Sequence, residues 1–165
     1  MARRARFGFN MNILHHSRHT KPELEQELNA RFCELEELLQ QSDFVSIHVD
    51  LNDQTHHLIG KQQIAQMKKT AILINVARGP VIDEQALINA LKEQQILAAG
   101  LDVFEKEPLQ ESGLFNLSNV ITLPHVGADT LSTRQAMDDL AFDNLSSALA
   151  GEQPRHMVNP QVWSV

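Results

Sequence analysis

Short apolar segments that alternate with helical patterns constrain the fold of this chain more than any other feature. Segments rich in β-branched and other apolar residues predict strands at 11–15, 44–49, 71–77, 98–103 and 120–123. Strands that alternate with helices are typical of βαβ units, in which neighbouring strands run parallel. Strands that are apolar along nearly their whole length are also typical of parallel sheets. The sequence therefore predicts an α/β fold built on a mostly parallel sheet.

Helical patterns fill most of the intervals between these strands. The first is a helix tail that ends near Gly8. The others are predicted at 22–29, 34–40, 60–67, 83–94 and 130–149. Asp83 is expected to cap the helix that it begins, and Gly151 is expected to stop the last one.

Composition excludes several classes of protein. The 165 residues suit one domain of ordinary size, and a net charge of −7 argues against a nucleic-acid surface. The single cysteine, Cys33, cannot form an internal disulfide and is compatible with a reducing compartment. No apolar run approaches the roughly 18 residues of a membrane span. We therefore expect a cytoplasmic protein whose partners include neither nucleic acid nor membrane.

Chemically capable side chains follow the last three predicted strands. They are Arg78, Glu107 and His125. Parallel strands end at the same edge of a sheet, so these side chains should converge on one crevice. A guanidinium can grip a carboxylate with two hydrogen bonds, and an imidazole can donate a proton to a carbonyl oxygen. Each residue also has a plain alternative: a surface or capping arginine, a solvated glutamate, a structural loop histidine.

Other polar residues carry weaker signals. Asp102 is a carboxylate inside an apolar strand, which is costly unless it has a partner such as the amide of a bound ligand. The histidines lack the spacing and the accompanying Cys or carboxylate set of a metal site, so we expect no metal. They include His15, His16, His19, His56 and His57. No activating group is visible near Cys33, and no serine nucleophile motif occurs.

Three motifs resemble those of the D-isomer-specific 2-hydroxyacid dehydrogenases, in their glyoxylate/hydroxypyruvate and 2-ketogluconate reductase branch. The motifs are INVARGPVIDE at 74–84, AGLDVFEKEPL at 99–109 and LPHVGA at 123–128. LLQQSDFV at 38–45 and THHLI at 55–59 support the resemblance. It runs through essentially the whole chain and implies a Rossmann-like doubly wound parallel sheet, incomplete at its N-terminal edge.

The resemblance implies catalytic roles for the three strand-end residues. Arg78 would hold the substrate carboxylate and polarise the 2-oxo group. His125 would be the general acid in reduction and the base in the reverse direction. Glu107 would hydrogen-bond His125 and tune it. The nicotinamide cofactor would supply the hydride.

The resemblance also implies a set of cofactor contacts. Asp102 would contact the nicotinamide carboxamide, and Val76, Ala77 and Gly127 would line the cofactor. After the predicted strand 11–15, an acidic residue would bind the ribose hydroxyls of NAD, whereas an arginine would accommodate the phosphate of NADP. The chain has HHSRH at 15–19 and no acid before Glu23. We therefore expect NADP(H) to be preferred, with Ser17 and Arg18 on the phosphate, and NAD(H) to remain possible.

One position departs from the family. Asp50 stands where much of the family has proline, in the loop beside the cofactor. Its charge could weaken the binding of a pyrophosphate, or the side chain could point away.

A larger departure concerns the start of the chain. The family's Gly-x-Gly-x-x-Gly turn, which cradles the pyrophosphate, should lie just before Met1. We expect residues 1–150 to be a partial NAD(P)-binding domain that lacks its first strand and this turn, with an open sheet edge. Residues 151–165 would be an arm returning to a substrate domain outside the sequence. Such a fragment should bind NADPH poorly and turn over little by itself.

Two functions compete on this basis. The first is reduction of glyoxylate, hydroxypyruvate or 2-ketogluconate to the D-2-hydroxy acid with NADPH, as part of a longer chain. The second is a non-catalytic dimerisation or protein-interaction module of the same fold. A homodimer is implied by the family in either case. A purely structural remnant would leave the retained acid–base set unexplained.

Overall fold

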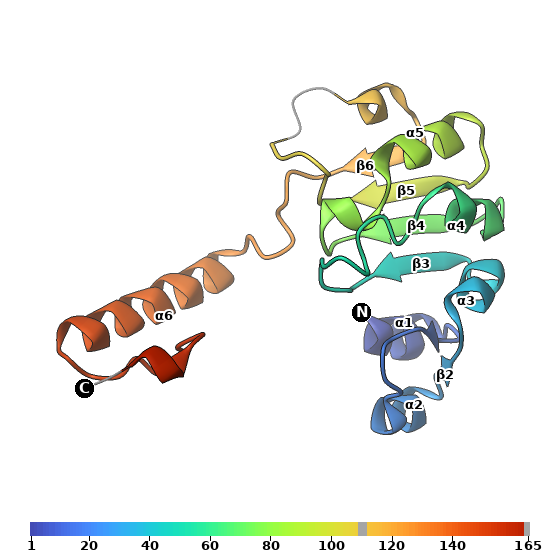
Figure 1. Ribbon diagram of the computed structural model, residues 1–165. Helices are drawn as coiled ribbons and strands as arrows, with labels where there is room; N and C mark the ends of the chain where they lie inside the picture. Colours follow the sequence, from blue (N-terminus) through green and yellow to red (C-terminus); the bar gives the residue numbers. More distant parts are fainter. Residues whose placement is uncertain (109–111, 164–165) are drawn as a thin grey trace. The chain divides into compact units, whose positions relative to one another are not determined.

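The computed structural model describes residues 1–108 and 112–163. Contacts divide the chain into two compact units, Met1–His125 and Val126–Val165, and each is described by itself (Figure 1). The predicted domains, 1–150 and 151–165, are functional assignments that this division does not test, and they stay a prediction.

The main sheet of the first unit has four parallel strands. They are β3 (Phe44–Ile47), β4 (Ile72–Asn75), β5 (Ala98–Leu101) and β6 (Val120–Thr122). They pair in the order β3-β4-β5-β6, and every pairing is parallel (Figure 1). This confirms the predicted α/β fold with a parallel sheet and flanking helices. Within the described residues β3 pairs on one side only, which agrees with the predicted open edge.

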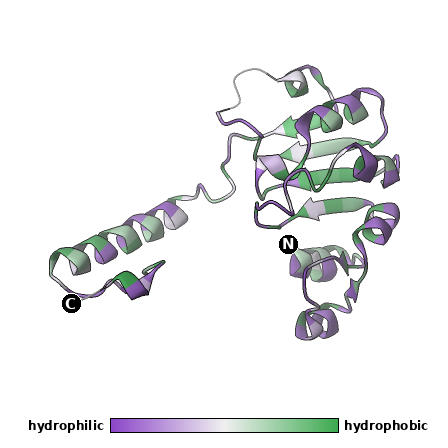
Figure 2. Ribbon diagram, in the orientation of Figure 1, coloured by the Kyte–Doolittle hydropathy of each residue, from purple (hydrophilic) through white to green (hydrophobic). Residues whose placement is uncertain are grey.

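The core lies between this sheet and three helices. The helix α3 (Leu35–Gln41) precedes β3, α4 (Lys61–Gln66) follows β3, and α5 (Glu84–Lys92) follows β4. Asp83 caps α5 as predicted, because its carboxylate accepts a hydrogen bond from the backbone N–H of Ala86 at 2.9 Å. Apolar side chains from strands and helices form one buried cluster, which includes Leu39, Val45, Ile64, Leu73, Leu87 and Leu101. Figure 2 shows the hydrophobic residues concentrated in the strands of the sheet.

A second, smaller sheet lies near the start of the chain. Its strands β1 (Leu14–His15) and β2 (Arg31–Phe32) are parallel, and α2 (Pro22–Leu28) connects them. The strand β2 was not predicted, because two residues give no periodic signal. The first helix, α1 (Ala2–Phe9), ends one residue later than expected. Asn10 rather than Gly8 takes the left-handed conformation that ends it, with φ 53°, because asparagine tolerates this region.

The second unit consists mainly of α6 (Leu131–Leu149). The Thr130 side chain caps it by accepting a hydrogen bond from the backbone N–H of Thr133. Gly151, with φ 77°, follows its end as predicted. A short 3-10 helix, η3, covers Pro160–Val162. Among the described residues, none of the helices has both the length and the apolar character that crossing a membrane requires.

Candidate active site

The register of the sheet brings the ends of β4, β5 and β6 to one edge. Asn75 lies beside Leu101, and Leu101 lies beside Thr122. The loops that follow these strands therefore leave the sheet side by side (Figure 1). They carry Arg78, Glu107 and His125, so the structure places the predicted residues at a common edge.

A hydrogen bond joins two of the three residues. His125 Nδ1 lies 2.7 Å from Glu107 Oε2, which is the contact that the family resemblance implies. The other carboxylate oxygen, Oε1, accepts a hydrogen bond from the backbone N–H of Phe104 at 3.0 Å. The carboxylate is thus held by its own loop and fixes the imidazole through Nδ1. Nε2 is then the ring nitrogen through which His125 can exchange a proton with a ligand.

The backbone of His125 is itself unusual. Its φ of 56° lies in the left-handed region, where residues other than glycine and asparagine are uncommon. Such a conformation costs on the order of 1 kcal/mol and persists where the surroundings impose it, often at functional sites. His125 lies three residues after the end of β6, and its side chain is held by the hydrogen bond to Glu107.

The environment of Glu107 favours its charged form. Desolvation by the surrounding protein opposes this. The hydrogen bonds from His125 and from the Phe104 N–H, together with the charges of His125 and Arg78, outweigh that effect and hold the pKa of the Glu107 carboxyl below its usual value. Glu107 is therefore an acceptor for His125 at neutral pH.

This lowered pKa predicts how stability depends on pH. A carboxyl whose pKa is lower in the folded chain stabilises the fold above its unfolded pKa, about 4.3 for glutamate, and loses that effect as pH falls through the folded value. The free energy of unfolding of wild type should exceed that of Glu107→Gln at pH ~7, by less than about 1 kcal/mol because solvent screens this carboxylate. The difference should vanish at strongly acidic pH. Urea unfolding at several pH values measures it, and a difference that grows on acidification would contradict the assignment.

The turn that carries Arg78 is organised by Asn75, which is only 1% exposed. The Asn75 side chain accepts a hydrogen bond from the Ala77 N–H at 3.0 Å and donates one to the Arg78 carbonyl at 2.9 Å. The guanidinium of Arg78 donates to the Ala77 carbonyl at 2.7 Å. Sequence reasoning did not single out Asn75. A polar amide at the end of an apolar strand, costly to bury without partners, is the signal that could have found it.

The Arg78 loop and the Glu107 loop touch backbone to backbone. A Cβ added to Gly79 would lie 1.8 Å from the carbonyl oxygen of Phe104 and 2.5 Å from the nitrogen of Glu105. No side chain fits in that space. The residue after Arg78 therefore has to be glycine, and this contact sets the spacing between the two loops.

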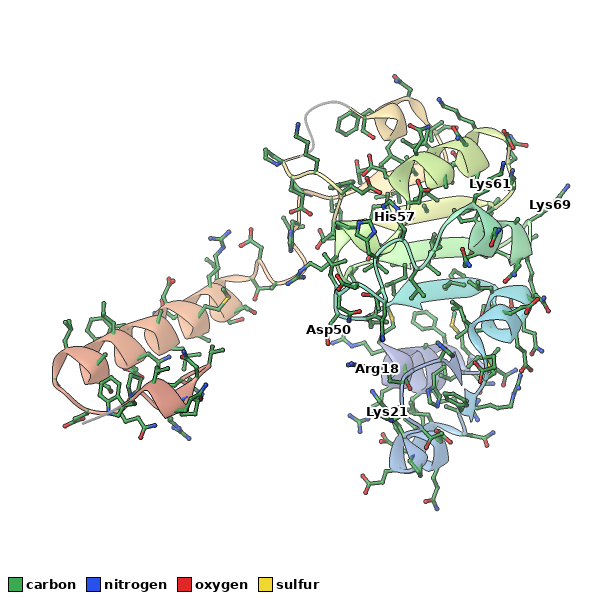
Figure 3. The ribbon with its side chains drawn as sticks, viewed as in Figure 1. Arg18, Lys21, Asp50, His57, Lys61 and Lys69 are labelled. Atoms are coloured by element: carbon green, nitrogen blue, oxygen red, sulfur yellow. The ribbon has the colours of Figure 1, made fainter. Side chains whose placement is uncertain are left out.

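An open cavity of about 440 Å³ adjoins this edge. Its lining comes from the residues after β3 and β4: His48, Val49, Asp50, Leu51, Val76, Ala77 and Arg78. Two residues predicted to line the cofactor thus share a cavity with the predicted carboxylate-binding arginine. Asp50 contributes to the same lining (Figure 3). A larger cavity, about 550 Å³, borders residues that precede β5 and β6 and so lies at the opposite ends of the strands.

The other residues predicted to contact the cofactor lie in several parts of the chain. Asp102 follows β5 directly, is 5% exposed, and its backbone N–H donates to the Asn75 carbonyl at 3.0 Å. Ser17 and Arg18 follow β1 in the smaller sheet. The Ser17 hydroxyl donates to the His19 carbonyl at 2.7 Å, whereas the Arg18 guanidinium has no hydrogen bond or ion pair within the described residues. Gly127 belongs to the second unit.

A family model described as "D-isomer specific 2-hydroxyacid dehydrogenase, NAD binding domain" matches residues 1–127. A curated glyoxylate/hydroxypyruvate reductase B from Enterobacter agglomerans is 54% identical over 163 residues, which are 98% of this chain and 50% of that protein. The chain thus spans about half the length of the curated relatives it matches.

Solved structures with a similar fold are also found. The TT0316 protein from Thermus thermophilus superposes with a TM-score of 0.87 at 39% identity, over 95% of this chain and 49% of that one. A glyoxylate reductase from Paecilomyes thermophila superposes with a TM-score of 0.83 at 42% identity, over 97% of this chain and 48% of that one.

Proposed function

The chain belongs to the D-isomer specific 2-hydroxyacid dehydrogenase family, and from this membership we propose that its strand-end site reduces a small 2-oxo acid to a D-2-hydroxy acid. The family model is that of an NAD-binding domain, so the chain is an oxidoreductase module that takes a nicotinamide cofactor. The observation that carries the proposal is the Glu107–His125 hydrogen bond of 2.7 Å at the edge where Arg78 also lies.

Each residue has one task in the proposed reaction. Arg78 binds the substrate carboxylate and lies beside the 2-oxo oxygen, where its charge stabilises the oxygen as negative charge develops. His125 donates the proton from Nε2 to that oxygen, and Glu107 keeps the ring oriented through Nδ1. The reduced nicotinamide, when bound, supplies the hydride to the carbon. Val76 and Ala77 are proposed to line the cofactor, together with Asp102 and Gly127.

The substrate is proposed from the relatives. Curated relatives of this chain, 54% and 52% identical to it, are named glyoxylate/hydroxypyruvate reductase B. We therefore propose that the substrate is glyoxylate, hydroxypyruvate or 2-ketogluconate. Because the relatives are about twice as long, the groups that contact the rest of the substrate are proposed to lie outside these 165 residues, which alone should turn over little. A cytoplasmic homodimer completes the proposal.

The test is consumption of NADPH by the protein that contains this chain, together with its substrate-binding part. Glyoxylate and hydroxypyruvate should each be reduced, whereas their amides should not, because Arg78 needs a carboxylate to bind. Equal turnover of acid and amide would contradict the role of Arg78. No turnover at all, with cofactor binding intact, would favour the non-catalytic interaction module.

Cofactor preference yields a separate prediction. Arg18→Ala should weaken NADPH binding about tenfold or more and leave NADH binding unchanged, because a charged hydrogen bond contributes about 1.5–3 kcal/mol. Lys69→Ala removes an exposed cation distant from Arg18 and serves as control (Figure 3). Fluorescence titration of both cofactors measures the change. A loss shared equally by NADPH and NADH, or no loss, would show that Arg18 does not contact the phosphate.

A further inference from the structure

A second histidine–glutamate pair lies beside the site and has no task in the proposed reaction. His57 Nε2 lies 2.8 Å from Glu105 Oε1. Their side chains remain 40% and 36% exposed, so the pair is not part of the core. Glu105 belongs to the loop that carries Glu107, whereas His57 belongs to the loop before α4 (Figure 3). The pair therefore joins two loops that are far apart in the sequence.

Glu105 also binds the beginning of α5. Its Oε1 accepts a hydrogen bond from the Glu84 N–H at 3.0 Å, and its own N–H donates to Glu84 Oε2 at 3.3 Å. The Ser112 hydroxyl donates to Glu84 Oε1 at 3.1 Å. Two carboxylates thus share one network, where their charges repel each other. His57 is the side chain that offers Glu105 a donor and, when protonated, a compensating positive charge.

The backbone of His57 fixes it to the segment after Arg78. Its N–H donates to the Pro80 carbonyl at 2.8 Å, and the Ile59 N–H donates to the Val81 carbonyl at 3.1 Å. Ile59 and Ile82 form a parallel bridge in the same stretch. The φ of His57 is 52°, so this backbone is held in the left-handed region. One side of the pair is therefore anchored to the Arg78 segment and the other to the Glu107 loop.

We propose that His57 and Glu105 are positioning residues that hold the Glu107 loop against the segment after Arg78. They act through Glu107 and Arg78 and touch neither substrate nor cofactor. The backbone contact at Gly79 fixes the approach of the loops at Phe104 and at the Glu105 nitrogen. The His57–Glu105 pair adds a side-chain contact at Glu105, two residues before Glu107, which has to meet His125. The positioning role itself does not depend on the proposed function. Its effect on catalysis rests on the proposed function.

The test compares two variants with a matched control. His57→Ala removes the donor, and His57→Gln restores a side-chain N–H that can reach Glu105. The control, His15→Ala, breaks another histidine–glutamate pair, in which His15 Nε2 lies 3.0 Å from Glu25 Oε1, without touching either loop. The readouts are the pKa of Glu107, by carboxyl carbon NMR, and hydrogen exchange at the Phe104 amide, which donates to Glu107.

In His57→Ala we expect the pKa of Glu107 to rise toward its usual value and the Phe104 amide to exchange faster. His57→Gln should recover much of both properties, and His15→Ala should resemble wild type. If His57→Ala does not fold, Glu105→Gln weakens the same pair and should also make the Phe104 amide exchange faster. Unchanged Glu107 titration and unchanged Phe104 exchange in the folded variants would overturn the proposal.

A kinetic readout separates this inference from the proposed function. Where the wild-type protein turns over 2-oxo acids, His57→Ala should lower kcat/KM about tenfold to a hundredfold, because Glu107 and Arg78 would no longer be correctly oriented toward the substrate. Cofactor affinity should not change, because His57 is not proposed to contact the cofactor. Absence of turnover in wild type would contradict the proposed function, while the NMR readouts would still decide the positioning role. Wild-type kcat/KM in His57→Ala would overturn that role.

Discussion

His125→Asn is expected to lower kcat for 2-oxo acid reduction about a hundredfold to ten-thousandfold, the usual contribution of a general acid. Asparagine suits this position for two reasons. It tolerates the left-handed backbone that His125 adopts, with φ 56°, and its amide N–H can replace the Nδ1 hydrogen bond to Glu107. It has no group that can deliver a proton from the position of Nε2. The variant thus removes the proton donor and keeps the local structure.

Steady-state kinetics with saturating cofactor measure this effect. The dissociation constant of the cofactor should not change, because His125 is assigned to the substrate oxygen. His156→Asn, which replaces an exposed histidine of the second unit, is the control and should keep the wild-type rate. A His125→Asn variant with wild-type kcat would show that another group supplies the proton.

Gly79→Ala is expected to lower the free energy of unfolding by about 3 kcal/mol or more. This equals or exceeds the largest cost that is usual when an extra group is forced into a packed core. The added Cβ would lie 1.8 Å from the Phe104 carbonyl oxygen and 1.9 Å from its carbon. These are backbone atoms of a buried residue, so no flexible side chain can move aside. The two loops would have to separate, which would also pull Arg78 away from Glu107.

Urea unfolding of this variant can be compared with that of Gly100→Ala. Gly100 lies within β5, and a Cβ there would meet nothing within 4 Å, so its replacement should change stability by less than about 0.5 kcal/mol. Equal stability of Gly79→Ala and Gly100→Ala would mean that the loops are not in contact as described.

The arrangement of the site was predictable because parallel strands end together. β4, β5 and β6 are apolar and well separated in sequence, so Arg78, Glu107 and His125 could be assigned to a common edge from the sequence alone. The hydrogen bond between Glu107 and His125 then followed from the family's motifs. Neither inference needed knowledge of packing.

Features that depend on packing could not be predicted in this way. The requirement for glycine at position 79 comes from the backbone of Phe104, which is distant in sequence. The pairing of His57 with Glu105 spans 48 positions and leaves no periodic signal. The strand β2 is two residues long and forms only because β1 offers a partner. These elements are set by contacts between segments, whereas propensity and patterning describe single segments.

Transfer of deuterium from the cofactor tests the central claim most directly. A reduced nicotinamide that carries deuterium at its transferable position would be incubated with glyoxylate or hydroxypyruvate and the protein that contains this chain. We predict that the product carries the deuterium on C2. The product of hydroxypyruvate, in which C2 is a stereocentre, should have the D configuration. In His125→Asn the transfer of deuterium should be much slower. Bound cofactor and substrate without any deuterium on C2 would contradict the assignment of Arg78, Glu107 and His125 as a reducing site.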